Sequence, residues 1–146
     1  MPSILQQIND QFLTALEGLK TDGTVRELAL RNSSAHGAKA LPALHVVPGD
    51  EQQIAEDSQG YTLRRSYLLK LAFGPAREPF TKAAELVAAI QDTIEADLQM
   101  ASLASGGILY RGEQPWISDD TEAVEGTFLL YDVTYRRRRA ASDEGY

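Results

Sequence analysis

Apolar residues recur along the chain at two different periods, and these periods separate predicted helices from predicted strands. Residues 3–19 and 80–103 carry apolar side chains at spacings of three and four, which is typical of a helix with one buried face. Ser3 and Gln6 have the spacing of a capping box, which predicts the start of the first helix. The apolar stripe of the first helix consists of Ile4, Leu5, Ile8, Phe12, Leu16 and Leu19, and that of the second consists of Leu86, Val87, Ile90, Ile94, Leu98 and Ala101.

Alternating apolar and polar residues predict a sheet between and after the helices. The clearest alternation covers residues 61–73, where Tyr67, Leu69, Leu71 and Phe73 share one face. Hairpin-like connections between the predicted strands favour a mainly antiparallel arrangement. The other strands are predicted over residues 24–30, 42–47, 108–112 and 126–136.

The fold class predicted from these elements is α+β. We expect a mainly antiparallel β-sheet covered by two helices, in the order α-β-β-β-α-β-β. The length of 146 residues fits one domain with a substantial core. That domain is predicted to cover residues 1–136, and residues 137–146 are predicted to form a flexible C-terminal tail.

The stretches without apolar periodicity are predicted to be loops. Residues 31–41 are small and polar, and Pro48 followed by Gly49 has the chemistry of a type II turn that would end the preceding strand. Residues 49–60 and 113–125 contain several carboxylates and neither Lys nor Arg. They are therefore predicted to form two acidic loops.

The amino-acid composition argues against several kinds of binding site and partner. The chain has a formal net charge of −7 and no cysteine, which excludes disulfides and thiolate metal sites. An acidic chain is a poor wrapper of DNA and a poor ligand for anionic membranes, because both bind chiefly through Lys and Arg. No apolar run reaches the roughly 20 residues of a membrane-spanning helix. We therefore expect neither sequence-specific nucleic acid nor a membrane among the partners.

The residues that could carry catalytic chemistry are few. Ser33, Ser34 and His36 fall in one predicted loop and could be joined to Asp22 as a triad, but a hydroxyl-rich loop beside one histidine is far more often only a loop. His45 is predicted to lie on a sheet surface rather than to bind a metal, which needs three or four convergent ligands. We therefore predict that the protein is not an enzyme and has no catalytic residue, metal site or cofactor.

Four consecutive arginines, residues 136–139, leave three interpretations open. The run could be a subunit-contact arm that meets an acidic loop of a neighbour, a solvated strand end, or a patch for nucleic acid or phosphate. The acidity of the chain makes nucleic acid the weakest of the three. If the strand persists, Arg136 and Arg138 point to one face of the sheet and Arg137 and Arg139 to the other.

The second acidic loop holds two further candidates. Trp116 follows Pro115 and is either a rigid interface anchor or a side chain packed on its own core. Asp119 and Asp120 could bind a divalent cation, which prefers carboxylate oxygens. Adjacent carboxylates in a loop give no fixed geometry, so a solvated loop is the favoured interpretation.

Three stretches of the sequence carry a resemblance to a known family. Residues 103–112 (Leu-Ala-Ser-Gly-Gly-Ile-Leu-Tyr-Arg-Gly) follow the long helix, and residues 126–136 (Gly-Thr-Phe-Leu-Leu-Tyr-Asp-Val-Thr-Tyr-Arg) close the domain. Residues 41–50 contain a Pro-led strand that ends in an acidic turn. Together they resemble the bacteriophage tail terminator proteins, the minor tail protein U-like family. Members often follow the last Tyr-Arg with a Gly-Asp-Pro-like turn, whereas this chain continues with arginines.

The resemblance implies a structural role in a virus particle. It implies a hexameric ring that caps the phage tail tube, stops its growth and joins it to the head-proximal neck. The implied partners are other copies of the chain, the tail tube protein, a neck or stopper protein and, in a contractile tail, the sheath. The implied location is the tail–neck junction of the virion, after assembly in the host cytoplasm.

Closed rings use head-to-tail contacts between two different surfaces, and this chain offers basic clusters and acidic loops. Because DNA slides through such a ring, we expect acidic loops to line the lumen. The alternative function is a small nucleic-acid-binding or regulatory module that uses residues 136–139. The expected interface residues are Arg64, Arg65, Trp116, Arg136, Arg137, Arg138 and Arg139, and the expected lumen residues are Asp50, Glu51, Glu56, Asp57, Asp119, Asp120 and Glu122.

Overall fold

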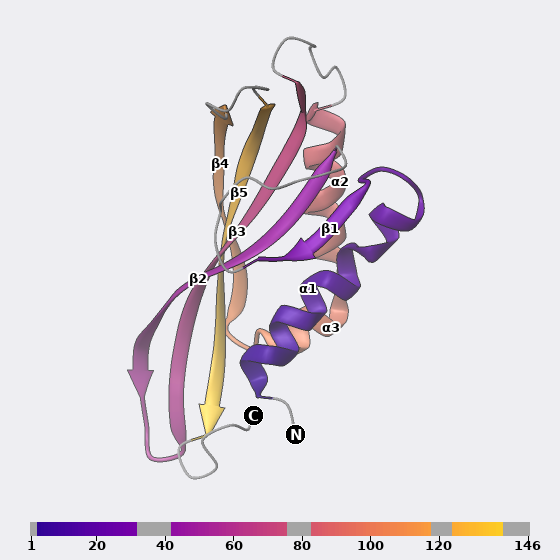
Figure 1. Cartoon of the computed structure of the whole chain (residues 1–146). Helices are drawn as coiled ribbons and strands as arrows, with labels where there is room; N and C mark the ends of the chain where they lie inside the picture. Colours follow the sequence, from indigo (N-terminus) through magenta and orange to yellow (C-terminus); the bar gives the residue numbers. More distant parts are fainter. Residues whose placement is uncertain (1–2, 32–41, 76–82, 118–123, 139–146) are drawn as a thin grey trace.

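The computed structural model describes residues 3–31, 42–75, 83–117 and 124–138. These residues form one five-stranded sheet with three helices on one of its faces (Figure 1). The helices are α1 (Ile4–Thr21), α2 (Ala83–Ala96) and α3 (Leu98–Leu103), and the strands are β1 (Glu27–Leu30), β2 (Ala43–Glu56), β3 (Gly60–Pro75), β4 (Gly107–Ile117) and β5 (Val124–Arg138).

The sheet is mostly antiparallel, as predicted. Its strands lie in the order β1-β2-β3-β5-β4. Only β1 and β2 are parallel, and the other three neighbouring pairs are antiparallel. The mixed α/β class with a mainly antiparallel sheet is therefore confirmed, whereas the observed order of elements is α-β-β-β-α-α-β-β.

Helix α1 confirms the first predicted helix and extends it by two residues. The Ser3 side chain accepts a hydrogen bond from the Gln6 backbone N–H at 3.1 Å, as an N-cap does. The helix ends at Asp22, and Gly23 follows with φ +83°, a backbone conformation that glycine adopts without strain. Its buried residues are Ile4, Ile8, Phe12, Leu16 and Leu19.

The second predicted helix, 80–103, is wrong in one respect: it is two helices that meet at Asp97. The backbone of Asp97 is extended (φ −78°, ψ 108°), and its side chain accepts a hydrogen bond from the Met100 N–H at 2.7 Å. An aspartate that caps a new helix in this way competes with continuation of the old one. The break turns Leu98 outward, where it is 85% exposed, and buries Met100 instead.

The predicted turn at Pro48 and Gly49 is also wrong, because β2 continues through it to Glu56. A register shift between Pro48 and Glu51 marks a β-bulge, which absorbs the irregularity without ending the strand. Among the described residues β1 pairs with β2 only from Ala43 to Val46, so Pro48 needs no N–H for a neighbouring strand there and is tolerated.

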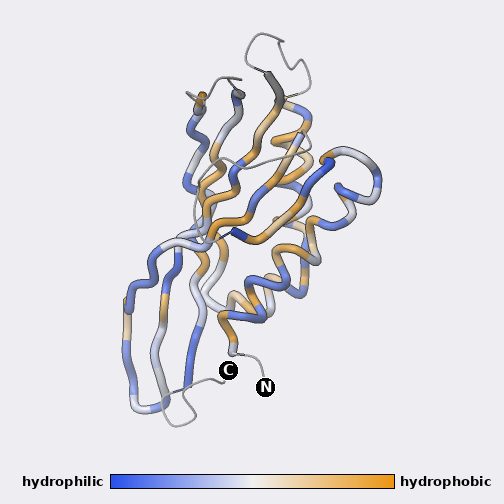
Figure 2. Tube along the Cα trace, viewed as in Figure 1, coloured by the Kyte–Doolittle hydropathy of each residue, from blue (hydrophilic) through white to orange (hydrophobic). Residues whose placement is uncertain are grey.

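The predicted acidic loop 49–60 is consequently a β-hairpin. Asp57 closes it by accepting hydrogen bonds from the N–H groups of Gln59 and Gly60. With the end of β5, this hairpin projects past the start of α1 and is largely hydrophilic (Figures 1 and 2). We call this projection the distal arm and define it as residues 49–66 and 133–138.

The last two strands are longer than predicted. β4 and β5 take up residues 113–117 and 124–125 of the second predicted acidic loop, and the rest of that loop lies outside the described residues. Arg137 and Arg138, which were predicted to begin a flexible tail, lie on β5. Residues 139–146 and nearly all of the predicted loop 31–41 are outside the described part of the chain.

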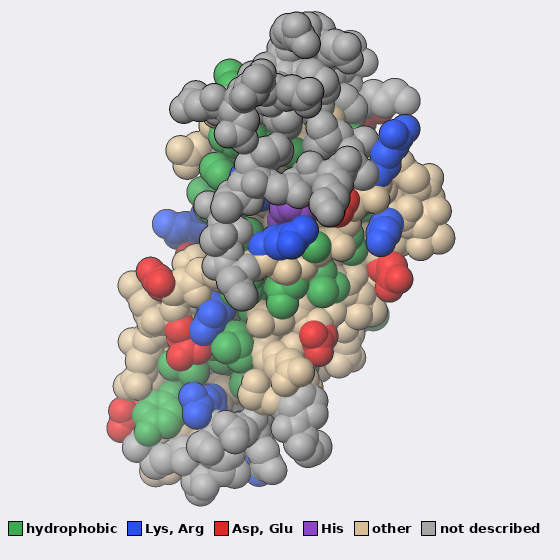
Figure 3. Space-filling view, viewed as in Figure 1, with side chains coloured by type: hydrophobic (Ala, Val, Ile, Leu, Met, Phe, Trp, Pro, Cys, Tyr) green, Lys and Arg blue, Asp and Glu red, His purple; other side chains and the backbone are tan. Residues whose placement is uncertain are grey.

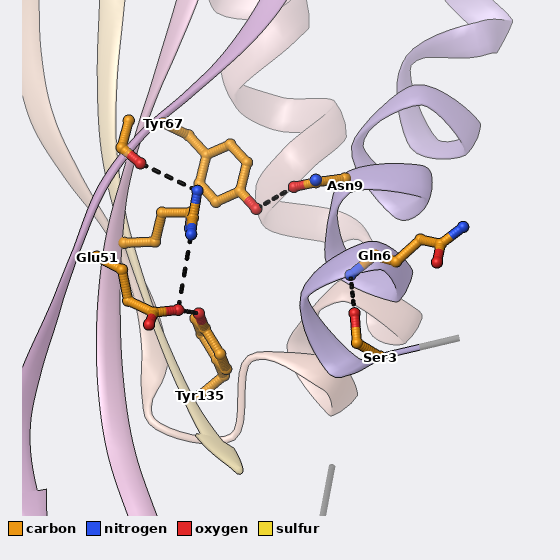
Figure 4. Close-up of polar contacts among 8 residues, drawn as sticks. Ser3, Gln6, Asn9, Glu51, Tyr67 and Tyr135 are labelled. Atoms are coloured by element: carbon orange, nitrogen blue, oxygen red, sulfur yellow. Dashed lines mark hydrogen bonds and ion pairs between the residues drawn. The ribbon is translucent and has the colours of Figure 1, made fainter. Parts of the chain in front are cut away.

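The core lies between the helices and one face of the sheet. Tyr67, Tyr131 and Tyr135 are its largest fully buried side chains, and the Phe12 ring lies 4.5 Å from that of Tyr67. Tyr67 donates a hydrogen bond from its hydroxyl to the Asn9 side chain, which ties α1 to β3 (Figure 4). No helix within the described residues is long and apolar enough to cross a membrane.

Candidate subunit interface

The distal arm brings the predicted interface arginines beside predicted lumen carboxylates of the same chain. Arg65 on β3 lies 3.7 Å from the Glu51 carboxylate on β2 and donates a hydrogen bond to the Gly49 carbonyl at 3.1 Å. The Tyr135 hydroxyl donates to the same Glu51 carboxylate (Figure 4). Glu51 therefore joins all three strands of the arm at its base.

The outer part of the arm is held in the same way. Arg136 on β5 binds the Asp57 carboxylate at 2.7 Å and donates to the Thr62 hydroxyl at 3.0 Å. The hydrogen bond from Arg136 is the main reason that the pKa of Asp57 is lowered. Asp57 therefore stays ionised, and paired with Arg136, at a more acidic pH than an isolated aspartate would stay ionised. Arg64 donates to the Gln52 side chain at 3.2 Å.

The unlike charges that we expected to meet between subunits therefore also meet within one chain. Figure 3 shows acidic and basic side chains interspersed over the arm rather than segregated. Arg136 and Arg138 alternate with Arg137 along β5, opposite Thr62, Gly60 and Tyr61 of β3, as the strand period predicts. Arg139 lies outside the described residues.

The Glu51 junction provides a stability test of the arm. Replacing Glu51 with alanine should lower the free energy of unfolding by about 2 kcal/mol, because it leaves the Tyr135 hydroxyl and the Arg65 guanidinium short of an acceptor. Urea unfolding followed by circular dichroism measures the change. Asp50→Ala is the matched control, since Asp50 is an exposed carboxylate on the same strand and should change stability by less than about 0.5 kcal/mol. Equal midpoints for the two variants would contradict the role given to Glu51.

Trp116 packs on its own sheet, on the face opposite the helices. Its ring lies 4.6 Å from the Lys70 ammonium and 6.0 Å from the Phe128 ring, and it contacts the buried pair Ala43 and Ala72. The half-buried position agrees with the second of the two interpretations, in which the indole packs against its own chain.

The two predicted acidic regions lie at opposite ends of the sheet. Asp57 follows β2 at the end where Gly60 pairs with Arg138, whereas β4 ends and β5 begins at the end where Pro75 pairs with Val124. Asp50 and Glu56 are exposed on β2. Asp119, Asp120 and Glu122 are outside the described residues. That both acidic regions line the lumen of one ring remains a prediction. Because the two regions lie at opposite ends of the strands, the prediction requires the strands to run parallel to the channel.

The histidine and triad candidates do not assemble a site within the described residues. His45 is buried rather than on the sheet surface, and its Nε2 lies 2.7 Å from the Glu27 carboxylate. Asp22 accepts hydrogen bonds from the backbone N–H and hydroxyl of Thr24. Ser33, Ser34 and His36 lie outside the described residues. Across the described part of the chain, no three His, Asp or Glu residues are grouped to hold a metal ion.

The sequence analysis missed a groove of about 230 Å³ between the ends of the helices and strand β4. We call it the edge socket. Its position depends on the helix break at Asp97, which periodicity did not reveal. The side chains that define it are Ile94 and Glu95 of α2, Asp97 at the break, Ile108 and Tyr110 of β4, and Tyr131 of β5.

Comparison of the chain with protein-family models and with curated proteins finds no match.

Proposed function

We propose that this chain is a structural subunit of a ring, the tail terminator at the head-proximal end of a bacteriophage tail. The observation that carries the proposal is that its single sheet ends in two unlike edges. One edge is β4, and the other is β2 beyond Val46, where pairing with β1 stops. Within the described residues neither edge has a neighbouring strand. Two unlike surfaces on one chain are what a closed head-to-tail ring requires.

The β4 edge has the properties of a surface that becomes covered in an assembly. Leu109 and Ile117 are large apolar side chains on this strand and are 56% and 65% exposed. An open edge strand with apolar side chains can pair with strands of other chains and cause aggregation, so proteins usually cover or interrupt such edges. A bulge at Gly112, which has φ +129°, interrupts β4. In the proposed ring, the distal arm of one copy lies against the β4 edge of the next.

The arginines favour the ring over the nucleic-acid alternative. A phosphate patch needs guanidinium groups directed at the ligand. Arg65 and Arg136 instead bind carboxylates of their own chain, and Arg64 binds Gln52. Charges that are largely balanced within the arm suit a contact between two protein surfaces, where complementarity sets register and partner choice.

The proposed partners follow from the resemblance stated above. Other copies of the chain complete a hexamer, the tail tube protein binds one side of the ring, and a neck or stopper protein binds the other. A contractile tail would add the sheath as a further partner. The proposed location is the tail–neck junction of the virion.

Mass photometry over a range of concentrations, with negative-stain electron microscopy, tests the ring. We expect particles of six copies, formed by the chain alone or after the tail tube protein is added. Leu109→Asp should raise the concentration at half-assembly at least tenfold, because it places a charge in the buried interface. The thermal midpoint of its monomer should fall only slightly, since Leu109 is mostly exposed in the single chain and the new carboxylate lies opposite that of Asp132.

The control is Thr14→Asp, which changes an exposed residue on α1, away from both open edges. It should assemble like the unaltered chain. A protein that stays monomeric at every concentration, with the tube protein present as well, would rule out the ring. Normal assembly by Leu109→Asp would leave the ring intact but remove β4 from its contact.

A further inference from the structure

The edge socket contains two hydrogen-bonding groups, from Tyr131 and Glu95, that no other described residue binds. The Tyr131 hydroxyl is buried and has no hydrogen-bond partner within the described residues. The Glu95 carboxylate lies close enough to influence Tyr131 electrostatically, and it makes no ion pair in the described part of the chain. A buried hydroxyl without a partner is costly, and a polar group of another molecule that reached it would offset that cost.

The rest of the socket defines the chemistry of that molecule. Ile94 and Ile108 give it apolar walls, and the rings of Tyr110 and Tyr131 lie 5.2 Å apart at a tilt of 54°. Asp97 adds a second carboxylate, already held in place by the Gln11 side chain at 3.1 Å and by the Met100 N–H. Apolar walls, aromatic rings and acceptors match a group with an apolar stem and a cationic head that only donates hydrogen bonds. Arginine has both parts.

We propose that the edge socket binds an arginine side chain from the β5 end of a second copy of this chain. The proposal rests on the ring proposed above and names the contact that joins its subunits. Arg137 and Arg138 end β5 in the distal arm, beyond Thr134, the last residue of β5 that pairs with β4. Arg138 is exposed there.

The donor must come from another copy because the strand itself prevents binding within one chain. Tyr131 lies in the socket and Arg138 lies on the same extended strand. At about 3.3 Å per residue, the two are roughly 23 Å apart along β5 and cannot fold back on one another. In a head-to-tail ring, the arm of one copy and the socket of the next are the two unlike surfaces that meet.

The binding test uses the Leu109→Asp chain, so that the socket is free of a neighbouring copy. Leu109 lies opposite Asp132, on the other face of the sheet from Tyr110 and Tyr131, so the socket is unaltered. A peptide that copies residues 133–139 is titrated in about 0.15 M salt, which screens unspecific attraction to an acidic protein. We expect amide shifts at Gly107 and Ile108 in NMR spectra. Glu95→Gln should weaken peptide binding about tenfold, because a charge-assisted hydrogen bond is lost.

The matched control is Asp92→Asn, an exposed carboxylate on the same helix outside the socket, which should weaken binding less than twofold. Tyr131→Phe should weaken binding about threefold without destabilising the chain, since no described residue binds that hydroxyl. Equal effects of Glu95→Gln and Asp92→Asn, or shifts confined to other residues, would overturn the socket proposal.

Assembly measurements on the full chain, without the Leu109→Asp change, test the socket proposal independently of the ring proposal. Glu95→Arg and Arg138→Glu should each reduce assembly at least tenfold, and the two changes combined should restore most of it. Rings that form normally with Glu95→Arg would overturn the socket and leave the ring. A chain that binds the peptide in the socket yet never forms rings would overturn the ring and leave the socket.

Discussion

Replacing Gly126 with alanine is expected to be among the most damaging single changes in this protein. Gly126 lies in the middle of the sheet on β5, opposite Ala72 of β3. An added Cβ would lie 1.9 Å from the Leu71 carbonyl oxygen and 2.7 Å from the Trp116 ring. The carbonyl belongs to a backbone held in the sheet and cannot rotate away. We expect a loss of at least about 3 kcal/mol in the free energy of unfolding, since overpacking here also displaces a strand.

Gly18→Ala is the control for this prediction, and its effect should have the opposite sign. Gly18 lies inside α1, and an added Cβ there would meet nothing within 4 Å. Alanine in a helix is about 0.5–1 kcal/mol more favourable than glycine, so the variant should be slightly more stable. Urea unfolding of both variants measures the two shifts. If Gly126→Ala unfolds at the same urea concentration as the unaltered chain, the pairing of β3 with β5 described above is wrong.

Local periodicity predicted the parts of the fold whose burial is regular. Helix α1 was recognised because each apolar residue of its stripe returns to the same side of the helix, from Ile4 to Leu19. The centre of β3 was recognised because Tyr67, Leu69 and Leu71 alternate with residues of the other face. In both elements one face packs against the main core, and the regular return of apolar residues to that face can be recognised in the sequence.

Residues 49–56 of the distal arm could not be predicted in this way because all of them are exposed, so no alternation of buried and exposed positions marks them as a strand. Residues 49–56 are strand by virtue of pairing with β3, and their own polar composition is typical of a loop. The break at Asp97 was hidden for a related reason. Apolar spacing continues across it through Leu98, and only the contacts of the Asp97 side chain with Met100 and Gln11 show that the helix restarts.

The candidate interface was predictable as a set of residues but not as an arrangement. The sequence singled out Arg65, Arg136, Glu51 and Asp57 by charge alone. That these charges pair within one chain depends on the register of β2, β3 and β5, which brings Arg136 beside Asp57, 79 positions away along the chain. The edge socket depends in addition on where α2 ends relative to β4. Contacts of such long range leave no local pattern.

The three buried tyrosines predict that the fold is lost sharply in alkali. Burial is the main reason that the pKa values of Tyr67, Tyr131 and Tyr135 are raised above the ordinary value near 10. A raised pKa means that the folded chain keeps the proton while the unfolded chain releases it. The stability that these groups contribute is therefore complete below pH 10 and is lost as the pH rises above it. Each group costs about 1.4 kcal/mol per pH unit, so three cost about 4 kcal/mol per unit.

With a typical domain stability of about 5–15 kcal/mol, such a slope should unfold the chain between about pH 11 and pH 14. These three residues are half of the six tyrosines in the chain. Their share of the phenolate absorbance at 295 nm should appear together with the change in circular dichroism at 222 nm, because they ionise only when the fold opens. The variant Tyr131→Phe distinguishes unfolding caused by ionisation of the buried tyrosines from other effects of alkali on the chain. Its hydroxyl has no partner within the described residues, so stability at pH 7 should be kept while the alkaline slope falls by about one third. Phenolate absorbance that rises fully before the circular dichroism changes would mean that the three hydroxyls are accessible in the folded chain, and the tyrosine-rich core described here would have to be rearranged.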